Sequence, residues 1–152
     1  DALALALDGD SAAVAARPVM DRFLVLSLRH RLRPQDLRAL TGAKALMLGI
    51  KRQWIDPEGT RRVGVGEVTI EGDLAVGNLV QDGVSAGDVW LRFQREGGAW
   101  RFDMTSLFDV GSYALEDRVA RRGTSPDAFI LSALHRVTGR PVTEAIWQPI
   151  GR

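Results

Sequence analysis

Apolar residues recur at helical spacing through the first third of the chain. Val19, Phe23 and Leu26, for example, lie on one stripe of a helix that Pro18 precedes. Alanine and leucine favour helices, and glycine, proline and aspartate mark their ends. These signals predict helices over residues 1–7, 11–16, 19–31, 34–40 and 43–55. Because Gly49 interrupts the last of these, a buried strand over 45–50 is the alternative.

The middle of the chain alternates apolar and polar residues in a way that predicts an antiparallel β-meander. Turn-forming glycine and aspartate residues separate the strands, which we expect over 62–70, 74–81, 88–96 and 99–107. The Gly97-Gly98 loop between the last two fits a tight hairpin and fixes their register. That register pairs Phe93 with Phe102, Leu91 with Met104, Arg92 with Asp103, Gln94 with Arg101 and Trp90 with Thr105. It therefore separates an apolar face from a more polar one.

The first hairpin of the meander is predicted with a three-residue loop over 71–73. This loop pairs Ile70 with Leu74 and Val68 with Val76. Glycines within the first two strands indicate bulges or a strong bend; they are Gly64, Gly66 and Gly77.

The tail of the chain is predicted to be helical. Ser112 is placed to cap a helix over 113–122, and Ser125 to cap a second helix that begins at Pro126. Gly139 ends this second helix, and Thr143 is placed to cap a last short turn. The element order thus predicts an α+β domain with an added helical segment.

The composition is that of an ordinary globular domain. The chain has 152 residues, of which 45% are apolar, so it can bury a core within a single domain over 1–152. Its 20 basic and 19 acidic side chains leave a net charge of +1, which argues against nucleic acid as a partner. The lack of cysteine excludes disulfides and thiolate metal sites, and no apolar run is long enough to span a membrane. We expect neither a metal nor a cofactor.

The first residue of the chain is Asp1 rather than an initiator methionine. Together with the absence of cysteine, this favours an exported, periplasmic protein of a bacterium. A fragment of a longer chain would show the same features.

Two motifs suggest chemistry that their context does not support. Residues 83–87, Gly-Val-Ser-Ala-Gly, match the nucleophile elbow of serine hydrolases, but they fall between two predicted antiparallel strands. The elbow requires a strand followed by a helix, so we interpret these residues as a hairpin loop. The arginines between Arg29 and Arg33 are typical of a solvated helix end, with an anion site as the alternative.

Few residues are candidates for acid–base catalysis. His30 continues the apolar stripe of its helix, which favours a histidine at the edge of the core over a general base. Asp103 is expected opposite Arg92, and this ion pair would keep the pKa of the carboxyl low and make it a poor base. No histidine and carboxylate pair occurs at metal-ligand spacing, so no metal site is predicted.

The last hairpin carries a family resemblance. It reads VWLRFQREGGAWRFD over residues 89–103, and the Asp8-Gly9-Asp10 break follows an Ala/Leu helix near the start of the chain. Over residues 1–108 the chain resembles the nuclear-transport-factor-2-like superfamily, which includes ketosteroid isomerases and polyketide cyclases. The resemblance implies N-terminal helices packed in a strongly curved, cone-shaped meander, with 109–152 as a helical extension. It also implies a homodimer through the outer sheet face, where we place Trp90 and Thr105 as interface candidates.

The resemblance implies a pocket inside the cone. Isomerase-type relatives use a tyrosine from the early helices, whereas the one tyrosine of this chain is Tyr113, beyond the meander. We therefore expect a non-enzymatic domain that binds an apolar small molecule or a partner segment. The residues expected to line its pocket are Phe23, Trp54, Leu91, Phe93, Phe102 and Met104. Two alternatives stay open: an isomerase, cyclase or dehydratase with Glu67, Asp73 or His30 as general base, and a structural interaction module with a filled pocket.

Overall fold

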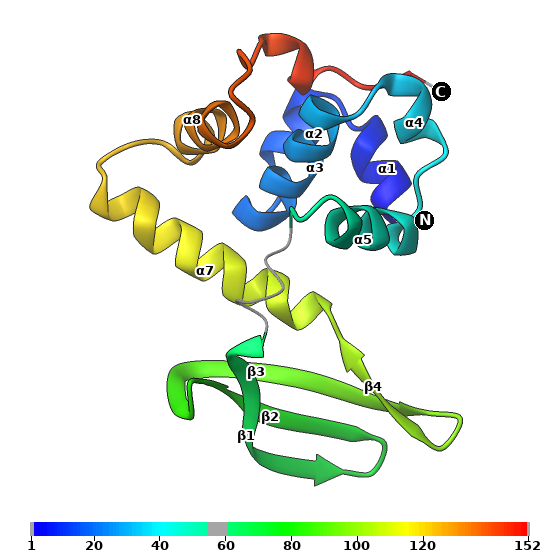
Figure 1. The fold of residues 1–152 in the computed structure, drawn as a ribbon, viewed down its shortest axis with the longest axis vertical. Coiled ribbons are helices and arrows are strands. Elements are labelled where there is room, and N and C mark those ends of the chain that lie inside the picture. The colour runs from blue at the N-terminus through cyan, green and yellow to red at the C-terminus, as the bar shows by residue number, and fades with distance from the viewer. Residues whose placement is uncertain (1, 55–60, 152) are drawn as a thin grey trace. The chain divides into compact units, whose positions relative to one another are not determined.

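The chain forms two compact units. The computed structural model describes residues 2–54 and 61–151. One unit, here called the helical unit, consists of Asp1–Leu48 and Gly111–Arg152, and the other, the sheet unit, consists of Gly49–Val110 (Figure 1). The single domain over 1–152 stays a prediction.

Helices form most of the helical unit. Before the sheet the chain forms α1 (Ala2–Asp8), α2 (Ser11–Ala15), α3 (Val19–Arg31), α4 (Pro34–Arg38) and α5 (Gly42–Lys51). After the sheet it forms α7 (Thr105–Arg121), α8 (Pro126–Thr138) and the 3₁₀ helix η1 (Glu144–Trp147). The helix expected over 43–55 is therefore confirmed as α5, although it ends at Lys51 and Ile55 lies outside the described residues.

Local capping chemistry sets several of these helix ends as the sequence predicts. The Asp10 carboxylate accepts a hydrogen bond from the Ala13 amide at 2.8 Å and begins α2. The Ser125 hydroxyl accepts from the Ala128 amide at 3.2 Å and begins α8. Gly139 ends α8 with a φ of 65°, a left-handed conformation that glycine adopts without steric cost.

Ser112 caps a different helix from the one predicted. It lies inside α7, which begins at Thr105 rather than at Tyr113. Its buried hydroxyl accepts a hydrogen bond from the Met20 amide at 3.2 Å. Because Pro18, the N-cap residue of α3, makes no side-chain capping bond, Ser112 supplies that bond from elsewhere in the helical unit.

The core of the helical unit is aliphatic. Side chains from α1, α2, α3, α4 and α8 are almost completely buried there; they are Leu7, Val14, Val25, Leu26, Leu37, Ile130 and Leu134. Arg22 of α3 supports this core from its edge, because it pairs with Asp127 of α8 and donates to the Arg17 carbonyl at 3.1 Å.

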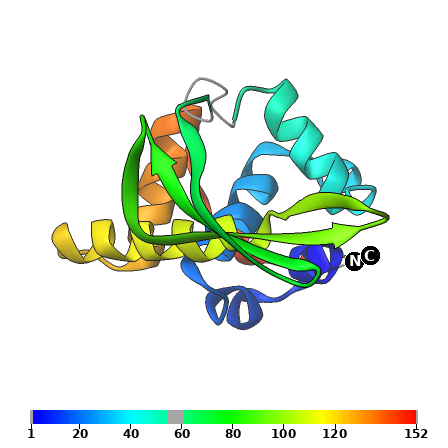
Figure 2. The same ribbon diagram turned by 90° about the horizontal axis from the view of Figure 1, so that it is seen from below.

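The sheet unit contains an open four-stranded antiparallel sheet. Its strands are β1 (Val63–Glu71), β2 (Leu74–Gln81), β3 (Val84–Glu96) and β4 (Ala99–Asp103), and they pair in sequence order. Figure 2 shows the twist of these strands. The coarse prediction of an α+β chain with an antiparallel meander is therefore confirmed.

The β3–β4 hairpin confirms the predicted register but ends early. Phe93 pairs with Phe102 and Arg92 with Asp103, across a turn in which Gly97 and Gly98 have φ angles of 57° and 81°. The predicted continuation of this last strand to Leu107 is wrong, because Asp103 Oδ1 accepts hydrogen bonds from the Thr105 amide at 2.9 Å and hydroxyl at 2.7 Å. These bonds begin α7 at Thr105.

The early end of β4 removes two predicted cross-strand pairs. Met104 follows the strand and Thr105 begins α7, so they do not pair with Leu91 and Trp90. Trp90 pairs with Asn78 on its other side.

The first hairpin is shifted by one residue from its prediction. Glu71 pairs with Leu74, and Ile70 pairs with Ala75 rather than with Leu74. The turn therefore has two residues. Gly72 has a φ of 61° there, a left-handed conformation that glycine adopts without steric cost. The predicted bulge is confirmed, because the register shifts between Val65 and Val68.

A second irregularity separates β2 and β3. The strand β3 begins at Val84, four residues earlier than the expected Asp88, because Asp82 and Gly83 form the turn with φ angles of 52° and 80°. The register then shifts between Asn78 and Val80. The Asn78 amide bridges this bulge by donating to the Gly87 carbonyl at 2.9 Å.

Candidate functional site

Along each strand, alternate residues point to the same side of the sheet. Directly paired residues of neighbouring strands share that side, so the register shows which residues of the four strands lie together. We call one of the two sides the apolar face. Its apolar members include Val63, Val65, Val68, Ile70, Ala75, Leu79, Val84, Leu91, Phe93, Trp100 and Phe102. Arg95, paired with Trp100, lies on the same side next to the hairpin turn.

The apolar face has a buried centre and an exposed margin. Leu91 is 4% exposed and Ala75 and Leu79 are also buried, whereas Ile70 is 59% and Val68 49% exposed. Trp100 and Phe102 are exposed on β4, and the Phe102 ring lies 5.3 Å from that of Phe93. The sheet unit thus presents exposed aromatic and branched aliphatic side chains from two of its strands, an arrangement typical of a binding surface.

This surface contains half of the residues predicted to line a pocket. Leu91, Phe93 and Phe102 lie together on the apolar face. Met104 and Trp54 belong to the sheet unit but lie outside its strands, and Phe23 belongs to the helical unit. The six-residue pocket stays a prediction.

The opposite side of the sheet is mixed in character. It carries Arg92 and Asp103, whose Nε and Oδ2 atoms lie 3.4 Å apart, and this confirms the predicted ion pair. The pKa of the Asp103 carboxyl is held below its ordinary value, chiefly by the hydrogen bonds from Thr105 and to a lesser extent by Arg92. Trp90 lies on this side and is 48% exposed. The dimer predicted there stays a prediction, although Thr105 does not lie in the sheet.

The three alternative general bases lie apart. Glu67 lies in the bulge of β1 and Asp73 in the turn after it, and both are exposed. His30 belongs to the helical unit, on the last turn of α3. Residues 83–87, the hydrolase-like motif, lie at the β2–β3 turn and on β3, as expected for a hairpin rather than a nucleophile elbow.

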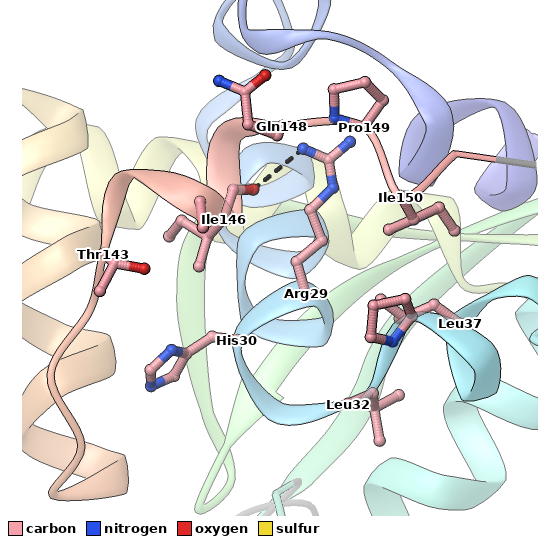
Figure 3. A pocket seen from close by; sticks show the side chains of 11 residues that line it. Arg29, His30, Leu32, Leu37, Thr143, Ile146, Gln148, Pro149 and Ile150 are labelled. Atoms are coloured by element: carbon pink, nitrogen blue, oxygen red, sulfur yellow. Dashed lines mark hydrogen bonds between the residues drawn. The ribbon is translucent and has the colours of Figure 1, made fainter.

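The helical unit contains a pocket that the sequence did not reveal. Its volume is about 330 Å³. It lies between the end of α3, the helix α4 and residues 143–150, here called the C-terminal segment. Figure 3 shows Arg29 reaching from α3 toward that segment. Its lining residues are Arg29, His30, Leu32, Pro34, Leu37, Thr143, Ala145, Ile146, Gln148, Pro149 and Ile150. The arginine cluster at the end of α3 was the one sequence signal near this place.

Arg29 is the buried cation of this pocket and is only 9% exposed. Its guanidinium donates to the carbonyls of Leu7 at 2.8 Å, Gly9 at 2.6 Å and Ile146 at 3.0 Å. Its Nε is buried without a hydrogen-bond partner among the described residues. Burial lowers the pKa of Arg29, against the opposing effect of the Asp8 carboxylate. Since arginine stays protonated in proteins, this side chain places a positive charge in the interior.

His30 lines the same pocket in a defined tautomer. The Thr138 hydroxyl donates to the Leu134 carbonyl at 2.7 Å, so it accepts the 2.9 Å hydrogen bond from His30 Nε2. The ring therefore carries its proton on Nε2. Burial lowers the pKa of His30, as do the nearby positive charges of Arg140, Arg31 and His135.

The lowered pKa of His30 predicts a loss of stability in acid. In the unfolded chain this histidine takes up a proton near its ordinary pKa of 6.5, whereas the folded chain binds it only at lower pH. The free energy of unfolding should therefore fall as the pH drops below about 6.5. We expect His30→Gln, which can still donate to Thr138, to reduce this fall in urea titrations between about pH 7.5 and pH 5.

A matched histidine variant isolates this effect. His135→Gln alters the second histidine of the chain, on the exposed side of α8, and should leave most of the His30 contribution in place, because burial, the largest cause of the lowered His30 pKa, is unchanged. An unchanged pH dependence in His30→Gln would contradict this assignment.

The part of the chain that the structure describes contains neither a metal-ion cluster nor a membrane-spanning helix. Within residues 2–54 and 61–151, His, Asp and Glu side chains form no group of three that could hold a metal ion. Across the same ranges, each helix is too short or too polar to cross a membrane.

Comparison of the chain with family models, with curated proteins and with solved structures finds no match.

Proposed function

We propose that this chain is a non-enzymatic binding domain whose apolar sheet face buries an apolar small molecule or partner segment. The observation that carries the proposal is the group of exposed aromatic and aliphatic side chains on the apolar face, namely Val68, Ile70, Trp100 and Phe102. The other face combines the exposed Leu74, Val76 and Trp90 with charged side chains such as Arg92 and Asp103. Each square ångström of apolar surface that a ligand covers contributes about 25 cal/mol before the costs of association.

We also propose that the domain is of the nuclear-transport-factor-2-like kind, with the cone-shaped curvature typical of that superfamily. Three features support this proposal: helices precede an antiparallel meander, the last hairpin has the expected register, and bulges interrupt both β1–β2 and β2–β3. Bulges increase local twist and bend the strand that carries them. The exposed Tyr113 lies on α7, not on the early helices where isomerase-type relatives carry their tyrosine, so binding is favoured over catalysis.

A pair of neighbouring variants tests the binding face. Ile70 and Thr69 are adjacent and exposed on β1 but point to opposite sides of the sheet. We expect Ile70→Lys to weaken equilibrium binding of the neutral apolar dye Nile red, because it places a charge on the apolar face. Thr69→Lys adds the same charge to the other face and should bind the dye as the parent chain does. Equal dye binding by the two variants would contradict the proposal.

A further inference from the structure

The pocket of the helical unit combines aliphatic walls with polar groups such as Arg29, His30 and Gln148. Leu32, directly after α3, and Leu37 of α4 line one side of it, and Ile146 and Ile150 approach from the C-terminal segment (Figure 3). A volume of about 330 Å³ is at the lower end of the range for small-molecule sites. These aliphatic side chains can therefore contact one side of a short alkyl chain and remove that side from water.

Positive charge gathers at the same place. Arg29 lines the pocket and is buried, and Arg31 and Arg140 lie close enough to His30 to lower its pKa. Arg38 holds the rim of the pocket, because its Nε donates to the Gly151 carbonyl at 2.7 Å. The interior of a protein screens charge less than water does, so these groups favour an anion nearby.

Two carboxylates reduce this positive charge only in part. The carboxylate of Asp8, the last residue of α1, attracts the Arg29 guanidinium and raises the pKa of Arg29. Asp36 pairs with Arg33 on the exposed surface, where its Oδ2 lies 2.9 Å from the arginine Nε. Among the described residues that line the pocket there is no aspartate or glutamate, although Glu144 lies between the lining residues Thr143 and Ala145.

We propose that this pocket binds a small molecule with a short alkyl chain and an anionic head group. The alkyl chain lies against Leu32, Leu37 and Ile150, and the head group lies toward Arg29. The proposal concerns the helical unit alone and does not depend on the binding face of the sheet. It assigns a role in anion binding to the arginine cluster at the end of α3, whereas a solvated helix end would have no such role.

The test compares ligands that share one chain and differ in the head group. We expect octanoate to bind the parent protein about tenfold more tightly than octanol in isothermal titration calorimetry, a difference of about 1.4 kcal/mol, because only the carboxylate makes a charge-assisted contact. Octylammonium should not bind. Octyl phosphate, measured beside octanoate, shows whether a carboxylate or a phosphate is the preferred head group. Octanol binding as tightly as both anions, or no binding of either anion, would overturn the proposal.

A matched pair of variants locates the site. Ile150→Glu places a carboxylate among the pocket walls and should weaken octanoate binding by about tenfold or more. Val137→Glu adds the same charge at an exposed position of α8 that does not line the pocket, and it should bind octanoate as the parent does. Urea unfolding of both variants confirms that they are folded. Octanoate binding that Ile150→Glu leaves unchanged would place the ligand elsewhere and overturn the proposal.

Discussion

Replacing Gly77 by alanine should destabilise the sheet unit by about 1–3 kcal/mol. Gly77 is buried in β2, and a β-carbon there would overlap Val65 Cγ1 and come within 3.3 Å of Val68 Cγ2. Both valines belong to the neighbouring strand β1, so the added methyl group forces either the side chains or the strands apart. Urea unfolding followed by tryptophan fluorescence measures the change, because Trp54, Trp90 and Trp100 all belong to the sheet unit.

Two controls separate overpacking from the general effect of removing a glycine. Gly42→Ala, at the start of α5, introduces a methyl group with nothing within 4 Å and should be neutral or slightly stabilising. Val65→Ala combined with Gly77→Ala should recover part of the loss, since it removes the group that the new methyl meets. Additive effects of these two substitutions would contradict the packing argument.

Replacing Arg29 by methionine should have a comparable effect on the helical unit, about 2–4 kcal/mol. The guanidinium joins the end of α1, the α1–α2 connection and η1 through the carbonyls of Leu7, Gly9 and Ile146. Without it these carbonyls lose their charged donor in a largely buried place. Methionine retains an apolar stem and removes the cost of burying a charge, which offsets only part of the loss.

Arg33→Met is the matched control for this prediction. Arg33 follows α3 and pairs with Asp36 at the surface, where its side chain is 74% exposed. Exposed ion pairs of this kind contribute little, so its loss should change the urea midpoint far less than the loss of Arg29. Equal midpoints for Arg29→Met and Arg33→Met would show that the buried bonds do not hold the helical unit together.

Local chemistry explains what the sequence predicted well. Asp10 and Ser125 cap helices through amides three residues away, and Gly97-Gly98 fixes the β3–β4 register within the hairpin itself. In each case the deciding interaction lies within a few residues of the signal. The α+β class and the apolar face of the sheet could be inferred for the same reason.

The features that the sequence did not predict depend on interactions that compete with one another or that join residues far apart in the chain. Asp103 could either continue β4 or cap a helix, and its two bonds to Thr105 decide for the helix. Ser112 caps α3 across 92 residues, and Arg29 meets the Ile146 carbonyl across 117. The pocket of the helical unit is likewise formed by residues far apart in the chain, those of α3 and α4 and those of the C-terminal segment. No pattern in either segment alone could indicate it.

Binding at the apolar face of the sheet is the central claim, and the Nile red dissociation constant of Ile70→Lys relative to Thr69→Lys tests it most directly. The two substituted positions are adjacent on an exposed strand and point to opposite sides of the sheet. Our account predicts a dissociation constant about tenfold higher, or more, for Ile70→Lys, with Thr69→Lys close to the parent chain. A ratio near one, or weaker binding by Thr69→Lys, would contradict it.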